Sequence, residues 1–362
     1  MKQVLALAVG MSILAIPALA QEEPVLNIYN WSDYIAEDTI SNFEAQTGIK
    51  VNYDVFDGNE VLEAKMLTGS SGYDVVVPTN NFLERQIQAG IYMELDASKL
   101  PNLKNMDPAI MTTLAISDPG NTHAIVYMWG TTGMGYSAKA IAERMPDAPS
   151  DSWDMIFDPE IAKNFADCGI TMLDAPAEVM SAALNYLGLD PLSEDEGDLQ
   201  KATDLVLSVR PYIRYFHSSQ YISDLANGDI CLSLGWSGDI FIAQARAVEA
   251  ANGVEVVYVI PKEGAQVWTD NMAIPKDAPH PDNAHKFINY IMEPEVVAAI
   301  SDYVFYANGN AASTPLIDPA VTGDPAIYPP DDVKAKLFAI KSHSPAYDRL
   351  LTRAWTRIKT GQ

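Results

Sequence analysis

The segment LNIYNWSDYIAEDTISNFEAQTGIKV, which begins at Leu26, reads as a strand, a helix and a second strand. Residues 25–29 form an apolar, β-prone run, and apolar residues then recur at helical spacing until Gly48 ends the helix. A second β-prone run covers residues 49–55. Two strands joined by a helix form a parallel pair with a right-handed crossover. The chain is therefore expected to fold around an α/β core.

The same alternation continues along the chain. A helix is expected over residues 60–67, a buried strand over 73–78 and a further helix over 82–89, which places Thr79 at the carboxyl end of a strand. The stretch 127–137 is extended and rich in glycine, which suits a segment that crosses between two domains. The α/β pattern thus reaches from the start of the chain to this crossing.

A second α/β unit is expected over residues 153–250. Its clearest part has a strand at 230–234, a loop at 235–238 and a helix from Asp239 onward. Residues 254–264 form a further strand and are a candidate for the return crossing. Helices dominate the remainder of the chain.

Residues 1–20 read as a signal peptide. Lys2 gives a positive start, an apolar run follows, and the small residues before Gln21 fit cleavage after Ala20. Gln21 is not a cysteine, so no lipid anchor is expected. We therefore expect a protein exported to the periplasm. About 340 residues would remain, which is more than one hydrophobic core usually holds, and this predicts two domains.

Charge and motifs restrict the possible functions. The net charge of −25 disfavours nucleic acid and anionic lipid and attracts cations. The sequence has no phosphate-binding GxxxxGK loop and no HExxH zinc motif, and the GWSG segment lacks the final glycine of a nucleophile elbow. No cofactor, metal or catalysis is therefore expected, and an extracellular amine oxidase or hydrolase is the enzymatic alternative.

Cys168 and Cys231 are the two cysteines of the chain. In an oxidising compartment two cysteines most simply form a disulfide, and two free buried thiols are the alternative. Neither has a CxxC or histidine neighbour at metal-ligand spacing.

Three segments share one pattern, in which a tryptophan is followed by a hydroxyl and then by an aspartate. They are WSD at 31–33, WSGD at 236–239 and WTD at 268–270. A single copy is more often a core ring beside a helix cap. Three copies, of which the first two follow predicted strands, favour a ligand site at the edge of an α/β sheet. Indole faces attract ammonium groups and carboxylates bind them, so the pattern suits an organic cation with an ammonium at each end.

The segments YNWSDYI, DVFDGNEVLEAK, RYFHSSQYISDLANGDIC, GWSGD and HSPAYDRLLTRAWTRIKTG resemble the periplasmic polyamine-binding proteins, most closely the putrescine-binding members. The resemblance covers nearly the whole mature chain. It implies a type II periplasmic binding protein, in which two α/β lobes joined by crossing segments enclose a central cleft. It also implies a monomer that delivers polyamine to the permease subunits of an inner-membrane ABC transporter.

The resemblance divides the mature chain between two lobes. The first lobe is expected to hold residues 21–128 and 255–300. The second is expected to hold residues 129–254, together with residues 301–362 and their C-terminal helices.

The family's binding residues match individual positions of this sequence. Asp239, assisted by Glu178, is expected to hold one ammonium group, and Asp33 with Asp270 the other, near the Ser32 hydroxyl. Cys168 and Cys231 match a bridged pair. The implied ligand contacts are Trp31, Ser32, Asp33, Tyr34, Thr79, Glu178, Ser218, Trp236, Asp239, Trp268, Asp270 and Tyr306.

Position 268 departs from the putrescine-binding pattern. Trp268 stands where the putrescine binder has phenylalanine and the spermidine binder has tryptophan. A preference for spermidine, agmatine or cadaverine therefore stays open. So does the role of a sensor subunit that presents its ligand to a receptor.

Overall fold

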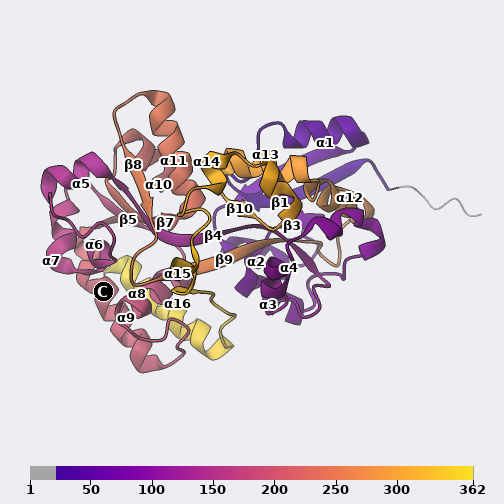
Figure 1. The fold of residues 1–362 in the computed structure, drawn as a ribbon. Helices are drawn as coiled ribbons and strands as arrows, with labels where there is room; N and C mark the ends of the chain where they lie inside the picture. Colours follow the sequence, from indigo (N-terminus) through magenta and orange to yellow (C-terminus); the bar gives the residue numbers. More distant parts are fainter. Residues whose placement is uncertain (1–21, 362) are drawn as a thin grey trace, which may run out of the picture.

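The computed structural model describes residues 22–361, and its strands follow the order β2-β1-β3-β9-β4-β7-β5-β6, with β8 and β10 paired to β4 and β11 to β9 (Figure 1). The strands are β1 (Val25–Trp31), β2 (Lys50–Phe56), β3 (Val75–Val76), β4 (Ala124–Ser137), β5 (Ile170–Met172), β6 (Ile213–Phe216), β7 (Leu232–Trp236), β8 (Val256–Val259), β9 (Ala265–Ala273), β10 (Ala307–Asn308) and β11 (Leu337–Phe338).

Helices connect these strands and cover them. The α-helices are α1 (Thr39–Thr47), α2 (Asn59–Leu67), α3 (Asn80–Gln88), α4 (Pro108–Leu114), α5 (Ala138–Arg144), α6 (Asp154–Phe157), α7 (Pro159–Ala162), α8 (Pro176–Tyr186), α9 (Glu196–Val209), α10 (Gln220–Asn227), α11 (Ser237–Ala250), α12 (Pro281–Ile291), α13 (Pro294–Val304), α14 (Pro319–Thr322), α15 (Asp331–Lys334) and α16 (Pro345–Thr360).

The long strand β4 joins two groups of elements. Its first half pairs with β9, and its second half pairs with both β7 and β8. Figure 1 shows β1, β3, α1 and α12 on one side of β4, and β5, β7, β8, α5 and α11 on the other. We call the group around β1, β2 and β3 the first lobe and the group around β5, β6, β7 and β8 the second lobe. The expected crossing segment at 127–137 lies within β4.

The opening strand–helix–strand prediction is confirmed. β1 and β2 run parallel in register from Val25 opposite Lys50 to Trp31 opposite Phe56. Gly48 ends α1 with φ of 72°, a left-handed conformation that favours glycine. Phe43 of α1 packs edge-on against Phe287 of α12, with ring centroids 5.2 Å apart. The first lobe thus has its own buried aromatic core.

Two local expectations are wrong. β7 runs to Trp236 and α11 begins at Ser237, so there is no loop at 235–238. The strand expected at 254–264 is β8, which pairs with the second half of β4 on the edge opposite β7, and the return crossing is made by β9. The lobe boundaries stay a proposal, and this pairing favours moving the return from residue 255 to β9.

The C-terminal part of the chain touches both lobes. β10 pairs with Met128 and Trp129 in the first half of β4, whereas α16 packs against α8 and α9 of the second lobe. Among residues 22–361, no helix is both long and apolar enough to cross a membrane. The expected signal peptide at 1–20 lies outside the described residues.

Candidate functional site

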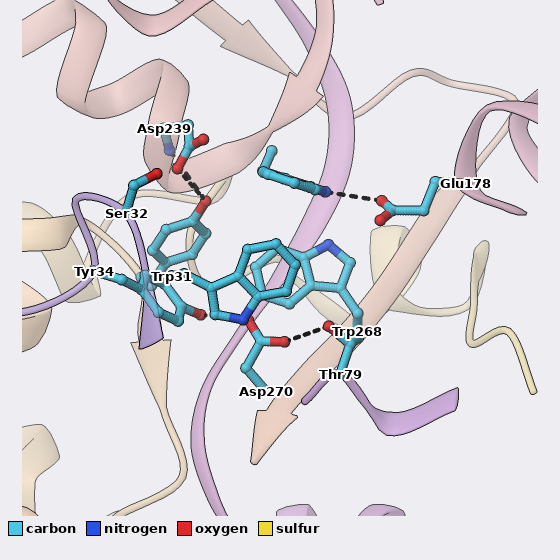
Figure 2. A pocket seen from close by; sticks show the side chains of 10 residues that line it. Trp31, Ser32, Tyr34, Thr79, Glu178, Asp239, Trp268 and Asp270 are labelled. Atoms are coloured by element: carbon cyan, nitrogen blue, oxygen red, sulfur yellow. Dashed lines mark hydrogen bonds between the residues drawn. The ribbon is translucent and has the colours of Figure 1, made fainter. Parts of the chain in front are cut away.

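Side chains from both lobes and from the crossing strands converge on one cavity, with about 390 Å³ of empty space in and around it. Ten of the twelve predicted contacts line the cavity (Figure 2): Trp31, Ser32, Tyr34, Thr79, Glu178, Trp236, Asp239, Trp268, Asp270 and Tyr306.

Two tryptophans meet in this cavity from opposite lobes. Trp31 is the last residue of β1 and Trp236 the last residue of β7, so both project from strand ends, where α/β sheets bind ligands. Their ring centroids lie 5.3 Å apart with an interplanar angle of 77°. The Trp31 indole nitrogen donates to the carbonyl of Val77 at 2.9 Å, which fixes the ring. The lobes are therefore in contact through the walls of the cavity.

Asp239 is held in the first turn of α11 by two tyrosines. The hydroxyl of Tyr221 donates to Oδ2 at 2.8 Å, and that of Tyr306 donates to Oδ1 at 3.0 Å. The carboxyl group is buried, and burial raises the pKa of Asp239 to about 7 although both hydrogen bonds favour the charged form. This group therefore titrates near neutral pH in the protein alone.

Asp270 has a similar arrangement on β9. Thr79 donates its hydroxyl to Oδ1 at 2.6 Å and Tyr34 donates to Oδ2 at 2.8 Å. Asn59 donates to the Thr79 hydroxyl oxygen at 2.9 Å and accepts from its backbone amide at 3.1 Å, which directs the Thr79 proton toward Asp270. Burial raises the pKa of Asp270 to about 7, and the negative charges of Glu178 and Asp239 contribute in the same direction.

Glu178 supplies a third buried carboxyl from the first turn of α8. Its Oε2 accepts from the Thr132 hydroxyl at 2.7 Å and from the Trp236 indole nitrogen at 2.8 Å. Burial raises the pKa of Glu178, while both donors favour its charged form. In Figure 2, Glu178 lies across the cavity from Asp239.

Within residues 22–361, the three carboxyl groups form no ion pair. No lysine, arginine or histidine of residues 22–361 lies within 4 Å of Asp239, Asp270 or Glu178. Buried charges are costly unless they are paired. Trp268 and Tyr306, with ring centroids 5.4 Å apart, add aromatic surface. This arrangement suits a ligand that brings more than one positive charge on an apolar frame.

Within the described part of the chain, no group of three or more potential metal ligands was found.

Two predicted contacts lie elsewhere. Asp33 has φ of 52°, and its carboxylate binds Arg246 of α11 at 2.6 Å on the surface instead of lining the cavity. Ser218 accepts from the Asp174 backbone amide at 3.1 Å and lines a separate cleft. Ser32 does line the cavity, but Figure 2 shows it on the Asp239 side and not on the Asp270 side, contrary to expectation.

Four residues that support the site were not predicted. Tyr221 donates to Asp239 and Thr132 to Glu178, Asn59 holds the Thr79 hydroxyl that donates to Asp270, and Arg246 binds Asp33. Tyr221 lies within the quoted segment HSSQYISDL and Thr132 within the glycine-rich crossing stretch. A lone hydroxyl or amide has no sequence pattern that marks it as a partner for a distant acid.

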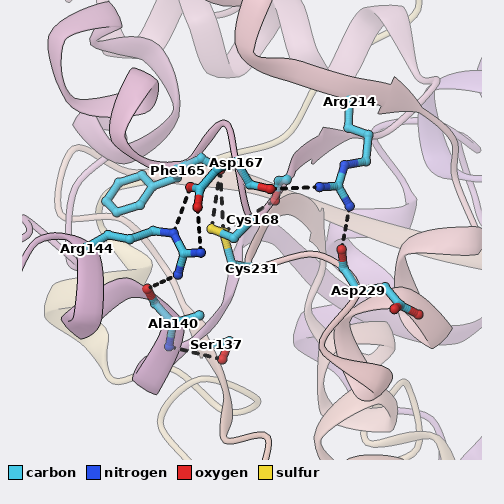
Figure 3. Close-up of a disulfide and its surroundings, with 10 residues drawn as sticks. Ser137, Ala140, Arg144, Phe165, Asp167, Cys168, Arg214, Asp229 and Cys231 are labelled. Carbon is cyan, nitrogen blue, oxygen red and sulfur yellow. Dashed lines mark hydrogen bonds and ion pairs between the residues drawn. A yellow bond between two sulfur atoms is a disulfide. The ribbon is translucent and has the colours of Figure 1, made fainter.

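The expected disulfide between Cys168 and Cys231 is present, with Cα atoms 5.5 Å apart (Figure 3). It ties the segment before β5 to the segment before β7. Nearby, Arg144 binds Asp167 at 2.8 Å. Because the two cysteines are 63 residues apart, the chain-entropy model gives a stabilisation of about 4 kcal/mol. The disulfide thus braces the second lobe away from the cavity.

Comparisons with known proteins agree with this geometry. The family model for bacterial extracellular solute-binding proteins matches residues 38–329. The putrescine-binding periplasmic protein PotF of Escherichia coli (strain K12) is 55% identical over 96% of this chain and 95% of its own. The putrescine-binding periplasmic protein SpuD of Pseudomonas aeruginosa (strain UCBPP-PA14) is 52% identical over 100% of this chain and 98% of its own.

Solved structures share the fold as well. The structure of a Listeria monocytogenes protein assigned to a spermidine/putrescine ABC transporter aligns with a TM-score of 0.84, 32% identity, and coverage of 94% of this chain and 100% of that one. The architecture is therefore that of a two-lobed periplasmic binding protein. From the site, the fold and the matches over nearly the whole length, the chain belongs to the family of bacterial extracellular solute-binding proteins.

Proposed function

We propose that this protein captures a polyamine in the periplasm, putrescine first of all, and delivers it to the permease subunits of an inner-membrane ABC importer. The observation that carries the proposal is a set of three buried carboxyls around an aromatic cavity, none of which forms an ion pair with a residue of the described range 22–361. The relatives named as putrescine-binding periplasmic proteins support the same ligand. The protein acts as a binding protein and not as an enzyme.

The ligand lies with one ammonium group at each end of the cavity. Asp239 receives one ammonium, with Ser32 beside it. Asp270 receives the other. Glu178 assists there and not at Asp239 as the sequence predicted, because it lies across the cavity from Asp239 (Figure 2). Trp268 covers the methylene groups between them. A charge-assisted hydrogen bond contributes about 1.5–3 kcal/mol and an ammonium over an indole face about 0.5–2 kcal/mol.

Binding also favours closure of the lobes. Asp239 and Glu178 belong to the second lobe, whereas Trp31 and Thr79 belong to the first. A ligand that touches both walls binds the closed arrangement more tightly and shifts the open–closed equilibrium toward it. This closed form is what a transporter, or the receptor of a sensing system, would recognise.

Calorimetry on Asp239→Asn tests the two-ended arrangement, because the change keeps the side-chain shape and removes the charge. The variant should bind putrescine about 1.5–3 kcal/mol more weakly, roughly tenfold to over a hundredfold. Butylamine, which lacks one ammonium, should bind the native protein correspondingly weakly, and this penalty should shrink in the variant. Equal affinities of the native protein for the diamine and the monoamine would refute the proposal.

Ligand length is tested with the native protein and a panel of amines. The indole of Trp268 forms part of the cavity wall, and the size of this ring affects the length of ligand that the cavity accepts. Parallel titrations with putrescine, cadaverine, agmatine and spermidine measure this preference. If spermidine binds most tightly, the proposed ligand is a triamine and not putrescine. A turnover of any of these amines on incubation would instead indicate an enzyme.

Export is proposed to occur through residues 1–20, with cleavage after Ala20. The mature chain then begins at Gln21 and is released from the periplasm without detergent. The intact mass of the periplasmic protein checks the cleavage site. A soluble protein that retains residues 1–20 would contradict it.

A further inference from the structure

We infer that Thr132 is a positioning residue that couples the carboxylate of Glu178 to the indole of Trp268, and that discrimination between diamines and monoamines depends on this coupling. The inference rests on the proposed function, because it concerns the second cation of the same site. It starts from the hydroxyl group of Thr132, which is buried on the crossing strand β4 with 1% of its residue surface exposed.

The direction of each hydrogen bond at this hydroxyl is fixed by its partners. The Trp268 indole nitrogen lies 3.2 Å from the Thr132 oxygen, and an indole N–H can only donate. The Thr132 oxygen therefore accepts, and its single proton is free to point at Glu178. Glu178 Oε2 lies 2.7 Å away and receives that proton. The Thr132 hydroxyl thus links the orientation of Trp268 to that of Glu178, because it is hydrogen-bonded to both.

Glu178 is left with one oxygen for the ligand. Its Oε2 is taken by two donors, Thr132 and the Trp236 indole nitrogen. No hydrogen bond from residues 22–361 reaches Oε1, and Glu178 lines the cavity. Two donors on one oxygen also stabilise the charged carboxylate. The pair therefore presents an anionic acceptor in a fixed orientation.

Trp268 is confined on its other sides. A Cβ atom at Gly130 would come within 2.8 Å of the Trp268 ring, so the indole packs directly on the glycine backbone. The Tyr306 ring approaches the same indole with centroids 5.4 Å apart. The bond to Thr132 holds the indole nitrogen at a third point. Loss of the hydroxyl would leave a buried N–H without its partner.

Thr132 occupies the position of β4 at which the pairing with β9 overlaps the pairing with β7. It lies opposite Gln266 of β9 and opposite Trp236 of β7. Glu178 and Trp236 come from the second lobe, and Trp268 comes from β9. The Thr132 hydroxyl thus contacts both β9, which carries Trp268, and the second-lobe residue Glu178. Its removal should therefore change the ratio of diamine to monoamine affinity, and not only weaken one contact.

The test compares Thr132→Val, which removes the hydroxyl and keeps the branched shape, with Thr132→Ser, which keeps the hydroxyl. By calorimetry, Thr132→Val should bind putrescine about ten- to a hundredfold more weakly and butylamine within about threefold of native, because the monoamine is held at Asp239. Thr132→Ser should stay within about threefold of native for both amines. Equal losses for both amines, or a serine variant as weak as the valine variant, would overturn the inference.

A pH profile adds a readout that packing alone does not move. Without the Thr132 donor, the charged form of Glu178 is less stable, so the midpoint of putrescine binding should shift to higher pH in Thr132→Val. An unshifted midpoint would count against the coupling. Thermal melting checks the fold, and Thr132→Ala replaces the valine variant if that variant does not fold. If native protein binds no polyamine, the proposed function fails; if native binds and Thr132→Val matches it, this inference alone fails.

Discussion

Acidification should weaken polyamine binding steeply, because Asp239 and Asp270 have to be ionised to receive an ammonium group. Burial raises the pKa of each to about 7 in the protein alone. An adjacent ammonium favours the charged form and lowers both pKa values on binding. Binding therefore releases protons, and the affinity rises with pH until it levels off above pH 7. Primary amines titrate near pH 10, so the ligand keeps its charges across this range.

The size of the effect follows from the two pKa values. For one acid with a pKa of about 7, the fraction ionised is about one half at pH 7 and about one hundredth at pH 5. Two such acids make binding roughly 10⁴-fold weaker at pH 5 than at pH 8, or about 5 kcal/mol. The logarithm of the association constant should then rise by about two for each pH unit below 7.

Calorimetric titrations with putrescine from pH 5 to pH 8.5, in buffers of different ionisation enthalpy, measure both the affinity and the number of protons released. In Asp239→Asn the slope should fall by about one, because one titrating acid fewer remains at the ligand. Circular dichroism at each pH controls for loss of the fold. An affinity that is constant from pH 5 to pH 8, or a slope that Asp239→Asn leaves unchanged, would refute the reasoning.

Three further measurements address other parts of the structure. Asp33→Asn breaks an exposed pair with Arg246, worth at most about 1 kcal/mol, so the putrescine affinity should fall less than about fivefold and the difference should fade in high salt; a loss as large as that of Asp239→Asn would show that Asp33 reaches the ligand. Asp239→Asn should raise the melting temperature of the protein without ligand at pH 8. Burial raises the pKa of Asp239 to about 7 in the folded state, so at pH values above 7 its ionised carboxylate destabilises the folded state relative to the unfolded one. A lower melting temperature would contradict this. Replacement of Cys168 and Cys231 by serine should lower the unfolding free energy by about 4 kcal/mol in urea titrations with little effect on ligand affinity, and unchanged stability would rule out a bracing role.

The sequence predicted those parts of the site that depend on local pattern. Trp31 and Trp236 follow apolar strands, so their place at the strand ends could be read from the periodicity and the helix that comes next. Asp33 could not be placed in this way. A single left-handed residue turns its carboxylate toward Arg246, which is 213 positions away in the chain. Neighbours in a motif therefore need not point the same way.

The supporting groups and the return crossing depend on tertiary pairing. Thr132 and Tyr221 are ordinary hydroxyl residues until folding brings acids from other elements within hydrogen-bond distance. Likewise β8 and β9 have similar strand patterns, and it is their pairing partners on β4 that assign them to different parts of the fold. Periodicity identifies a strand but not the strand beside it.

The contact between Trp31 and Trp236 has a spectroscopic consequence. Two indoles whose centres are 5.3 Å apart at a steep angle couple electronically, which gives a distinct near-ultraviolet circular dichroism and alters their fluorescence. Because the two rings come from different lobes, this signal depends on closure and is lost when the lobes separate. The protein thus carries an intrinsic optical reporter of its own conformation, which can be followed in real time without any attached dye.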